Sequence, residues 1–398
     1  MYIAQAFNVL HDWWRYLVGV IIAVAGVFIF SVPHAIAIGI ETFKGNIDAS
    51  RMNDTNYIMS LFEPNVNLVF VLLPFVGGLI ALLIAVKFIH KQSIKHLTTS
   101  RKKIDWKRFW FVFLLWGILS SGLVLVDYFF IAPDDYVLNF KLVPFIILCV
   151  IAIVMVPLQT SFEEYLFRGY LMQGIGVSSI HKKFPIVFIY TIVAILLYIY
   201  LNSIYSFGFF TSLGVLILLV GILILIVNLK LTDQLLETSS YEIIYRILKR
   251  NSTPLVITSL VFGLLHIANP EVDKLGPVIM VYYIGTGLFL GILTLMDEGM
   301  ELALGFHAAN NLFTALLVTA DWTAFQTHSI LKDMSDPETM ALGEIFVPVF
   351  VIFPILLFIL AKKYKWSNWK DKLFGKVIEP LKENYKIIDT IGEHDSKL

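Results

Sequence analysis

Three short groups of polar residues interrupt long apolar stretches of this chain. Carboxylates, imidazoles and amides are the side chains that take up protons, bind metal ions and donate hydrogen bonds in hydrolytic sites. The groups are Glu163-Glu164 with Arg168, Phe262 with His266, and His307 with Asn311. An ionisable group at membrane depth costs about 2.5 to 3.5 kcal/mol on insertion scales, so such groups usually face a bundle interior or a water-filled cavity.

The spacing within each group predicts roles for its members, provided that the segments are helical. Glu164 and Arg168 are four residues apart with the acid first, which is the favourable order for a helical ion pair. Glu163 points about 100° away from Glu164, so it is the carboxylate left for another task. The other two groups have the same spacing, which places each imidazole and its partner on one helix face.

Each group taken alone has a simpler explanation. A Glu–Arg pair at a cytoplasmic helix end is often an interfacial anchor, and a histidine in an apolar helix is often a hydrogen-bonded packing residue. Three groups on three segments favour a shared site instead. His34 and Asp127, by contrast, stand alone in their segments.

The composition indicates a polytopic membrane protein. Hydrophobic residues make up 58% of the chain and charged residues 15%, which is outside the range of soluble domains. The 30 basic and 30 acidic residues balance, so nothing suggests nucleic-acid binding. The single cysteine, Cys149, excludes a disulfide framework or a thiolate metal site.

The expected fold class is an all-α bundle with about ten transmembrane spans, each about 20 residues long. The apolar runs lie near residues 16–40, 67–89, 109–131, 142–160, 185–205, 209–229, 254–269, 277–296, 301–320 and 346–361. Basic residues from Lys87 to Arg108 predict a cytoplasmic loop, which we interpret as a solvated topological signal. Counting from this loop places both termini in the cytoplasm, including the lysine-rich tail from Lys362, and the loops at 41–66, 132–140 and 321–345 outside.

In this order, the three groups resemble the motifs of the CPBP intramembrane proteases, also called the Abi or CAAX-protease family. This family includes the type II CAAX prenyl endopeptidases. The flanking sequences are similar too, and they read RGYLMQGIG after the first group and GTGLFLGILTLMDEGMELALGFHAANNLF through the third. The resemblance covers about residues 145–320.

One departure from the family pattern is an insertion. His266 follows Glu164 by 102 positions, whereas family members usually carry the second motif a few tens of residues after the first. We predict an N-terminal three-span region at 1–140, a protease core at 141–325 with an inserted two-span hairpin near 185–252, and an outer loop, last span and charged tail at 326–398. Straight spans would place Glu163 near the cytoplasmic face and His266 beyond the midplane, unless Pro157 kinks the fourth span or the helix runs on past Arg168 at an angle.

The resemblance implies hydrolysis of a peptide bond inside or at the edge of the membrane. Glu163 would be the general base for a water molecule that it shares with His266. His307 and Asn311 would stabilise the oxyanion. Glu164 belongs to the same site, and its pairing with Arg168 would brace the helix, while Phe262 supports the second group.

The sequence leaves the activation of water open. A zinc ion held by Glu163, His266 and His307 is the alternative to a carboxylate acting alone, although the chain has no His-Glu-x-x-His pair. No cofactor is certain. The expected partners are the lipid bilayer and a membrane-anchored protein or peptide substrate, prenylated or not.

A non-enzymatic function is the competing hypothesis. A transporter or scaffold could use buried carboxylates and histidines to relay protons or bind a ligand, and a pseudoprotease could retain every motif residue. Internal repeats would favour a transporter, and we find no duplication between the two halves. The Gly-x-Ser-Gly and Gly-x-Gly-Asp motifs of other intramembrane protease classes do not occur.

Overall fold

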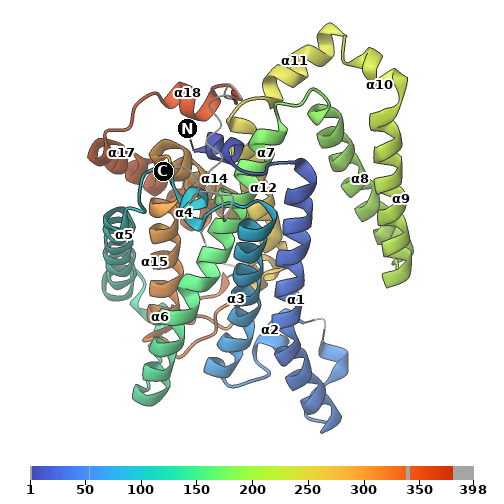
Figure 1. The fold of residues 1–398 in the computed structure, drawn as a ribbon. Coiled ribbons are helices and arrows are strands. Elements are labelled where there is room, and N and C mark those ends of the chain that lie inside the picture. The colour runs from blue at the N-terminus through green and yellow to red at the C-terminus, as the bar shows by residue number, and fades with distance from the viewer. Residues whose placement is uncertain (1, 53, 338–340, 380–398) are drawn as a thin grey trace, which may run out of the picture.

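The computed structural model describes residues 2–52, 54–337 and 341–379, and the predicted tail beyond residue 379 lies outside them. The described residues form a bundle of helices with one small sheet (Figure 1), so the predicted all-α class is confirmed. The long helices are α1 (Trp13–Phe43), α3 (Pro64–Ile89), α5 (Trp106–Val126), α6 (Leu142–Glu164), α8 (Phe184–Tyr205), α9 (Phe209–Asn228), α12 (Ser252–Leu264), α14 (Met280–Asp297), α15 (Glu301–Leu317) and α17 (Phe353–Tyr364). The short helices are α2 (Thr55–Met59), α4 (Ile94–Thr98), α7 (Met172–Ser178), α10 (Lys230–Leu235), α11 (Ser239–Leu248), α13 (Pro270–Leu275), α16 (Leu342–Val347) and α18 (Trp369–Phe374).

Eight helices of the described residues are long and apolar enough to cross a membrane, where the sequence predicted about ten. The two remaining predicted runs, 254–269 and 301–320, form helical segments of 17 residues each, Ser252–Ala268 and α15. At 1.5 Å per residue these segments are about 26 Å long, which is shorter than a hydrocarbon core of about 30 Å. They are apolar because they are packed inside the protein, with α15 against α5, α6 and α14, and α12 against α14 and α7.

The helix that carries the first motif is longer than the sequence predicted. Residues Leu142–Ser178 form one span of 37 residues, in which α6 continues through a π-helical turn, Tyr165–Leu171, into α7. The apolar run predicted from the sequence ended at residue 160, and the helix runs on past Arg168, which is one of the two alternatives that the sequence left open. The continuation past Glu164 brings the π-helical turn against α12, which carries the second motif. A π-helical turn within an α-helix is frequent at functional sites.

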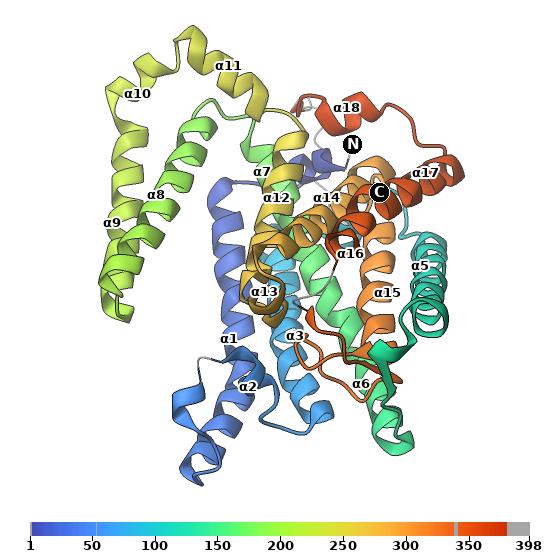
Figure 2. The same ribbon diagram turned by 180° about the vertical axis from the view of Figure 1, so that it is seen from behind.

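The two inserted apolar runs form a hairpin that stands beside the bundle. Figures 1 and 2 show α8 and α9 packed on each other and connected to the bundle through α10 and α11. Two tyrosines of α11 attach it to the loop before α8: Tyr245 donates a hydrogen bond to the carbonyl of Ile180 at 2.6 Å, and Tyr241 donates one to the carbonyl of Lys182. The second and third motifs therefore remain in the bundle despite the insertion.

A three-stranded sheet joins the loops at one end of the bundle. Its strands are β1 (Tyr136–Leu138), β2 (Val318–Thr319) and β3 (Leu331–Asp333), in the order β1-β3-β2. The strand β3 pairs antiparallel with β1, with Asp333 opposite Tyr136, and it pairs parallel with β2. The sheet thereby fixes the segment after α15, which lines the cavity described below.

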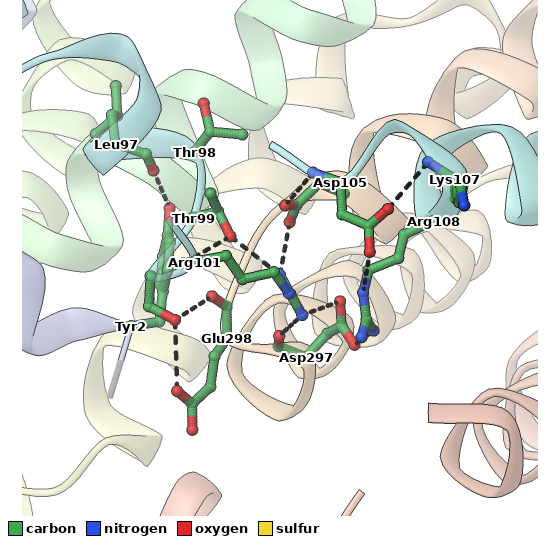
Figure 3. A network of polar contacts seen from close by, with 12 residues as sticks. Tyr2, Leu97, Thr98, Thr99, Arg101, Asp105, Lys107, Arg108, Asp297 and Glu298 are labelled. Carbon is green, nitrogen blue, oxygen red and sulfur yellow. Dashed lines mark hydrogen bonds and ion pairs between the residues drawn. The ribbon is translucent and has the colours of Figure 1, made fainter. Parts of the chain in front are cut away.

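A cluster of buried ion pairs joins the loop before α5 to the ends of α14 and α15 (Figure 3). We call Arg101, Asp105, Arg108, Asp297 and Glu301 the Asp297 cluster. Arg101 lies 2.9 Å from the Asp297 carboxylate and 3.0 Å from that of Glu301, and Arg108 bonds to Asp297 as well. The two acceptor side chains are each 1% exposed. The interpretation of this basic loop as a purely solvated signal is therefore wrong for Arg101 and Arg108.

Candidate active site

A cavity of about 720 Å³ lies where segments distant in the sequence meet. Its walls come from α3, the long helix that begins with α6, and helices α12 to α15, together with the residues that follow β2. All three predicted groups reach it, because Glu163, Phe262, His266, His307 and Asn311 line the cavity. Much of the remaining lining is apolar, with aromatic and aliphatic side chains.

The predicted helical ion pair is formed. The Arg168 guanidinium donates a hydrogen bond to Glu164 Oε1 at 2.9 Å, and both side chains are fully buried. Arg168 also donates to the carbonyl of Gly287 on α14 at 3.2 Å and lies 4.2 Å above the ring of Phe262 on α12. The pair therefore joins three helices, beyond bracing its own.

His307 lies between the two carboxylates of the first motif, which the sequence did not predict. Its Nδ1 is 2.8 Å from Glu164 Oε1, and its Nε2 is 3.4 Å from Glu163 Oε2. Because a carboxylate oxygen accepts hydrogen bonds, Nδ1 carries the proton and donates to Glu164. We call Glu163, Glu164, Arg168 and His307 the Glu163 cluster.

The Glu163 cluster has more negative than positive fixed charge. Two carboxylates face one guanidinium, so one negative charge is uncompensated unless a proton resides on His307 or Glu163. One oxygen of each carboxylate, Glu163 Oε2 and Glu164 Oε2, is buried without a hydrogen-bond partner among the described residues. A buried charge that lacks partners is costly, so these two oxygens are positions where a hydrogen-bond donor such as water would be stabilising.

Gln159 connects Glu163 to Asn311, and sequence analysis missed it. Its Nε2 donates to Glu163 Oε1 at 2.7 Å, and its Oε1 accepts a hydrogen bond from Asn311 Nδ2 at 3.1 Å. Gln159 is 4% exposed. One available signal was its position, because it is a polar residue in an apolar run, four residues before Glu163.

His266 shares the cavity, but its ring packs on another part of the wall. Its Nδ1 donates to the carbonyl of Phe262 at 2.7 Å, which leaves Nε2 as the acceptor of a neutral ring. The imidazole stacks on Tyr283 of α14 with 4.4 Å between ring centroids. The ring of Phe262 separates it from the Glu163 cluster, since Phe262 lies against both Arg168 and His307.

The alternative metal site is not formed by Glu163, His266 and His307. Across the described ranges, 2–52, 54–337 and 341–379, no three or more His, Cys, Asp or Glu residues are grouped so that they could hold a metal ion.

Comparison with known proteins agrees with the motifs. Residues 239–313, which contain the second and third motifs, match the family model described as type II CAAX prenyl endopeptidase Rce1-like, so the predicted resemblance is confirmed. A relative, the uncharacterized protein YyaK of Bacillus subtilis (strain 168), is 26% identical over 240 residues. This alignment covers 59% of the chain and 56% of YyaK, so the chain matches little more than half of that relative's length. No solved structure matches the chain significantly.

Proposed function

We propose that this protein is an intramembrane endopeptidase that hydrolyses a peptide bond in a membrane-associated protein or peptide. The observation that carries the proposal is Glu163, a buried carboxylate with one unpartnered oxygen in a cavity between apolar helices. The family match supports the same reaction class.

Glu163 serves as the general base. A water molecule at Glu163 Oε2 gives up a proton to this oxygen as its own oxygen attacks the scissile carbonyl carbon. Because the cluster has excess negative charge, taking up the proton neutralises it. When the C–N bond breaks, the same proton passes to the leaving amine. The second proton of the water stays on the oxygen that becomes part of the product carboxyl group, because Phe262 separates His266 from the Glu163 cluster.

Asn311 supplies the hydrogen bond to the oxyanion. Its amide already points into the cavity and donates to Gln159 at rest. A substrate carbonyl that enters between them would take over this donor, and the hydrogen bond would strengthen as negative charge develops. Gln159 then acts as a positioning residue, because it orients both the base and the oxyanion donor.

The contacts of His307 favour a different role from the one implied by the resemblance. Both of its ring nitrogens face carboxylates, so neither is directed at a substrate oxygen. We propose that His307 orients Glu163. His307 is itself held in place by the buried Glu164–Arg168 pair. Stabilisation of the oxyanion is left to Asn311.

The experiment is a cleavage assay with purified protein in lipid vesicles and a panel of membrane-anchored peptides, with products identified by mass spectrometry. Defined cleavage by the wild type and none by Glu163→Gln is the expected result. The matched control is Glu41→Gln, which changes a partly exposed carboxylate that bonds to Lys44. Absence of cleavage across the panel, prenylated peptides included, would favour a transporter, scaffold or pseudoprotease.

A further inference from the structure

The cavity has a second polar region, which the proposed mechanism does not use. Glu271, near the start of α13, lines the cavity with Asn269, Tyr283 and Trp322. Figure 2 shows α13 and α16 on the same face of the bundle, and both contribute residues to the cavity.

One carboxylate oxygen of Glu271 is hydrogen-bonded within the protein, and the other is not. Its Oε1 accepts a hydrogen bond from the backbone N–H of Ala324 at 2.8 Å, which fixes the carboxylate against the segment after β2. Its Oε2 is buried and lacks a hydrogen-bond partner in the part of the chain that the structure describes. Burial raises the pKa of this carboxyl group, against the effects of its hydrogen bonds and of nearby His266.

Apart from the histidines, the ionisable side chains that line the cavity are acidic or tyrosine. Four carboxylates line it, and the lining that the structure describes contains no lysine or arginine. The acidic lining residues are Glu163, Glu271, Asp333 and Glu344. A potential of this sign attracts cationic groups and disfavours anionic ones.

We propose that Glu271 recognises a positively charged side chain, a lysine or an arginine, that the substrate peptide carries close to the bond cleaved at Glu163. This inference rests on the proposed peptidase function and names the class of substrate. The cationic group forms an ion pair with Glu271 Oε2, and the apolar walls accommodate neighbouring hydrophobic residues.

A lysine or arginine fits this region better than a neutral donor. A hydrogen bond to an ionised partner is stronger than one between neutral groups, and here the acceptor is buried. The long aliphatic stem of either residue can pack against apolar and aromatic surface while its charge reaches the carboxylate. Trp322 and Tyr283 offer such surface on the wall of the same cavity.

The test uses pairs of otherwise identical apolar peptides that carry lysine or norleucine at successive positions around the cleavage site. At one position the wild type is expected to cleave the lysine peptide with a kcat/KM at least about tenfold higher than that for the norleucine peptide. In Glu271→Gln this ratio falls to near one. Glutamine keeps an oxygen for the Ala324 N–H, so the local backbone contact is retained.

Two further variants make the test specific to Glu271. Asp333→Asn removes another carboxylate of the cavity lining and is expected to retain the preference for lysine. Glu271→Lys is expected to transfer the preference to a glutamate peptide. The inference is overturned if the wild type does not prefer the lysine peptide. It is also overturned if Asp333→Asn and Glu271→Gln lose this preference to the same extent.

A binding measurement separates this inference from the proposed function. Labelled lysine and norleucine peptides are titrated against Glu163→Gln protein, which retains Glu271. Tighter binding of the lysine peptide supports cation recognition even if no peptide is ever cleaved, in which case only the peptidase function fails. Equal binding of the two peptides, together with normal cleavage by the wild type, refutes the role of Glu271 alone.

Discussion

The Asp297 cluster and the Glu163 cluster both bury two carboxylates beside arginine, but they differ in how completely the oxygens of these carboxylates are hydrogen-bonded. In the Asp297 cluster two arginines face Asp105, which is partly exposed, and the two buried acids Asp297 and Glu301, so carboxylates outnumber guanidinium groups by one here too. Every carboxylate oxygen of these two acids has a partner, including the Trp366 indole at 3.0 Å and the Asp105 N–H at 3.2 Å. In the Glu163 cluster one arginine faces two acids, and each acid has an oxygen without a hydrogen-bond partner.

This difference separates an ion-pair network that stabilises the fold from one suited to proton transfer. In the Asp297 cluster the oxygens of Asp297 and Glu301 are all engaged, so their contacts join the loop before α5 to the ends of α14 and α15. A carboxylate with an unpartnered oxygen in a cavity has an acceptor position to offer a water molecule, which a general base requires. The five predictions below test the comparison.

Glu163→Gln is expected to have the largest effect. The amide keeps the shape of the side chain but cannot accept the proton, so turnover should fall about 100- to 10,000-fold. The melting temperature in detergent should stay near that of the wild type, because a buried charge is removed. Peptide hydrolysis and melting are measured on the same preparation, and near-normal turnover would remove Glu163 as the base.

Asp297→Asn should affect stability instead of chemistry. It leaves Arg108 without the buried Asp297 charge and weakens the bond to Arg101. Breaking a buried ion pair costs about 3 to 5 kcal/mol. The melting temperature should drop, while turnover per folded molecule stays within about twofold of the wild type. A large loss of kcat in fully folded protein would contradict the division between the two clusters.

Asn311→Ala should reduce kcat about 100- to 1,000-fold, which is the usual cost of losing one oxyanion donor. KM should change little, since the hydrogen bond strengthens only in the transition state. The matched control is Asn310→Ala, because Asn310 bonds to Trp116 and to Asn311. Equal losses in the two variants would indicate altered packing and would argue against an oxyanion role.

The Glu164–Arg168 pair should show energetic coupling of about 0.5 to 3 kcal/mol in a double-mutant cycle. The cycle compares the detergent melting of Glu164→Gln, Arg168→Met and the double variant. Each single change leaves a buried group without its partner. The double variant should therefore be more stable than the sum of the two single destabilisations predicts. Simple additivity would mean that the 2.9 Å contact adds nothing to stability.

Zinc chelation should have the smallest effect, a change in turnover within about twofold. The reason is that Glu163, His266 and His307 are not grouped as metal ligands in the described structure. Zinc content and turnover are measured together in the wild type and in His307→Ala. Stoichiometric zinc that is lost in His307→Ala would replace the carboxylate mechanism with a metal site.

The sequence predicted best where the relevant interactions are local. The Glu164–Arg168 contact follows from a spacing of four residues in a helix, and it is present in the structure. The apolar runs predicted the helices because a helix that is buried in lipid or in protein needs apolar side chains along its own sequence. The end of the fourth span was mispredicted because a hydropathy window stops at charged residues, and a buried ion pair lets the helix continue.

The sequence by itself determined the fold class, the family resemblance and the identity of the polar residues, because composition, helical spacing and short motifs are local properties. Only the tertiary structure decided which of these residues touch. His307 reaches Glu164 across 143 positions, and Asn311 reaches Gln159 across 152. No local pattern encodes such contacts, since they depend on how α15 packs against α6. The same packing placed Glu271 in the cavity, through a contact with Ala324 that lies 53 residues further along the chain.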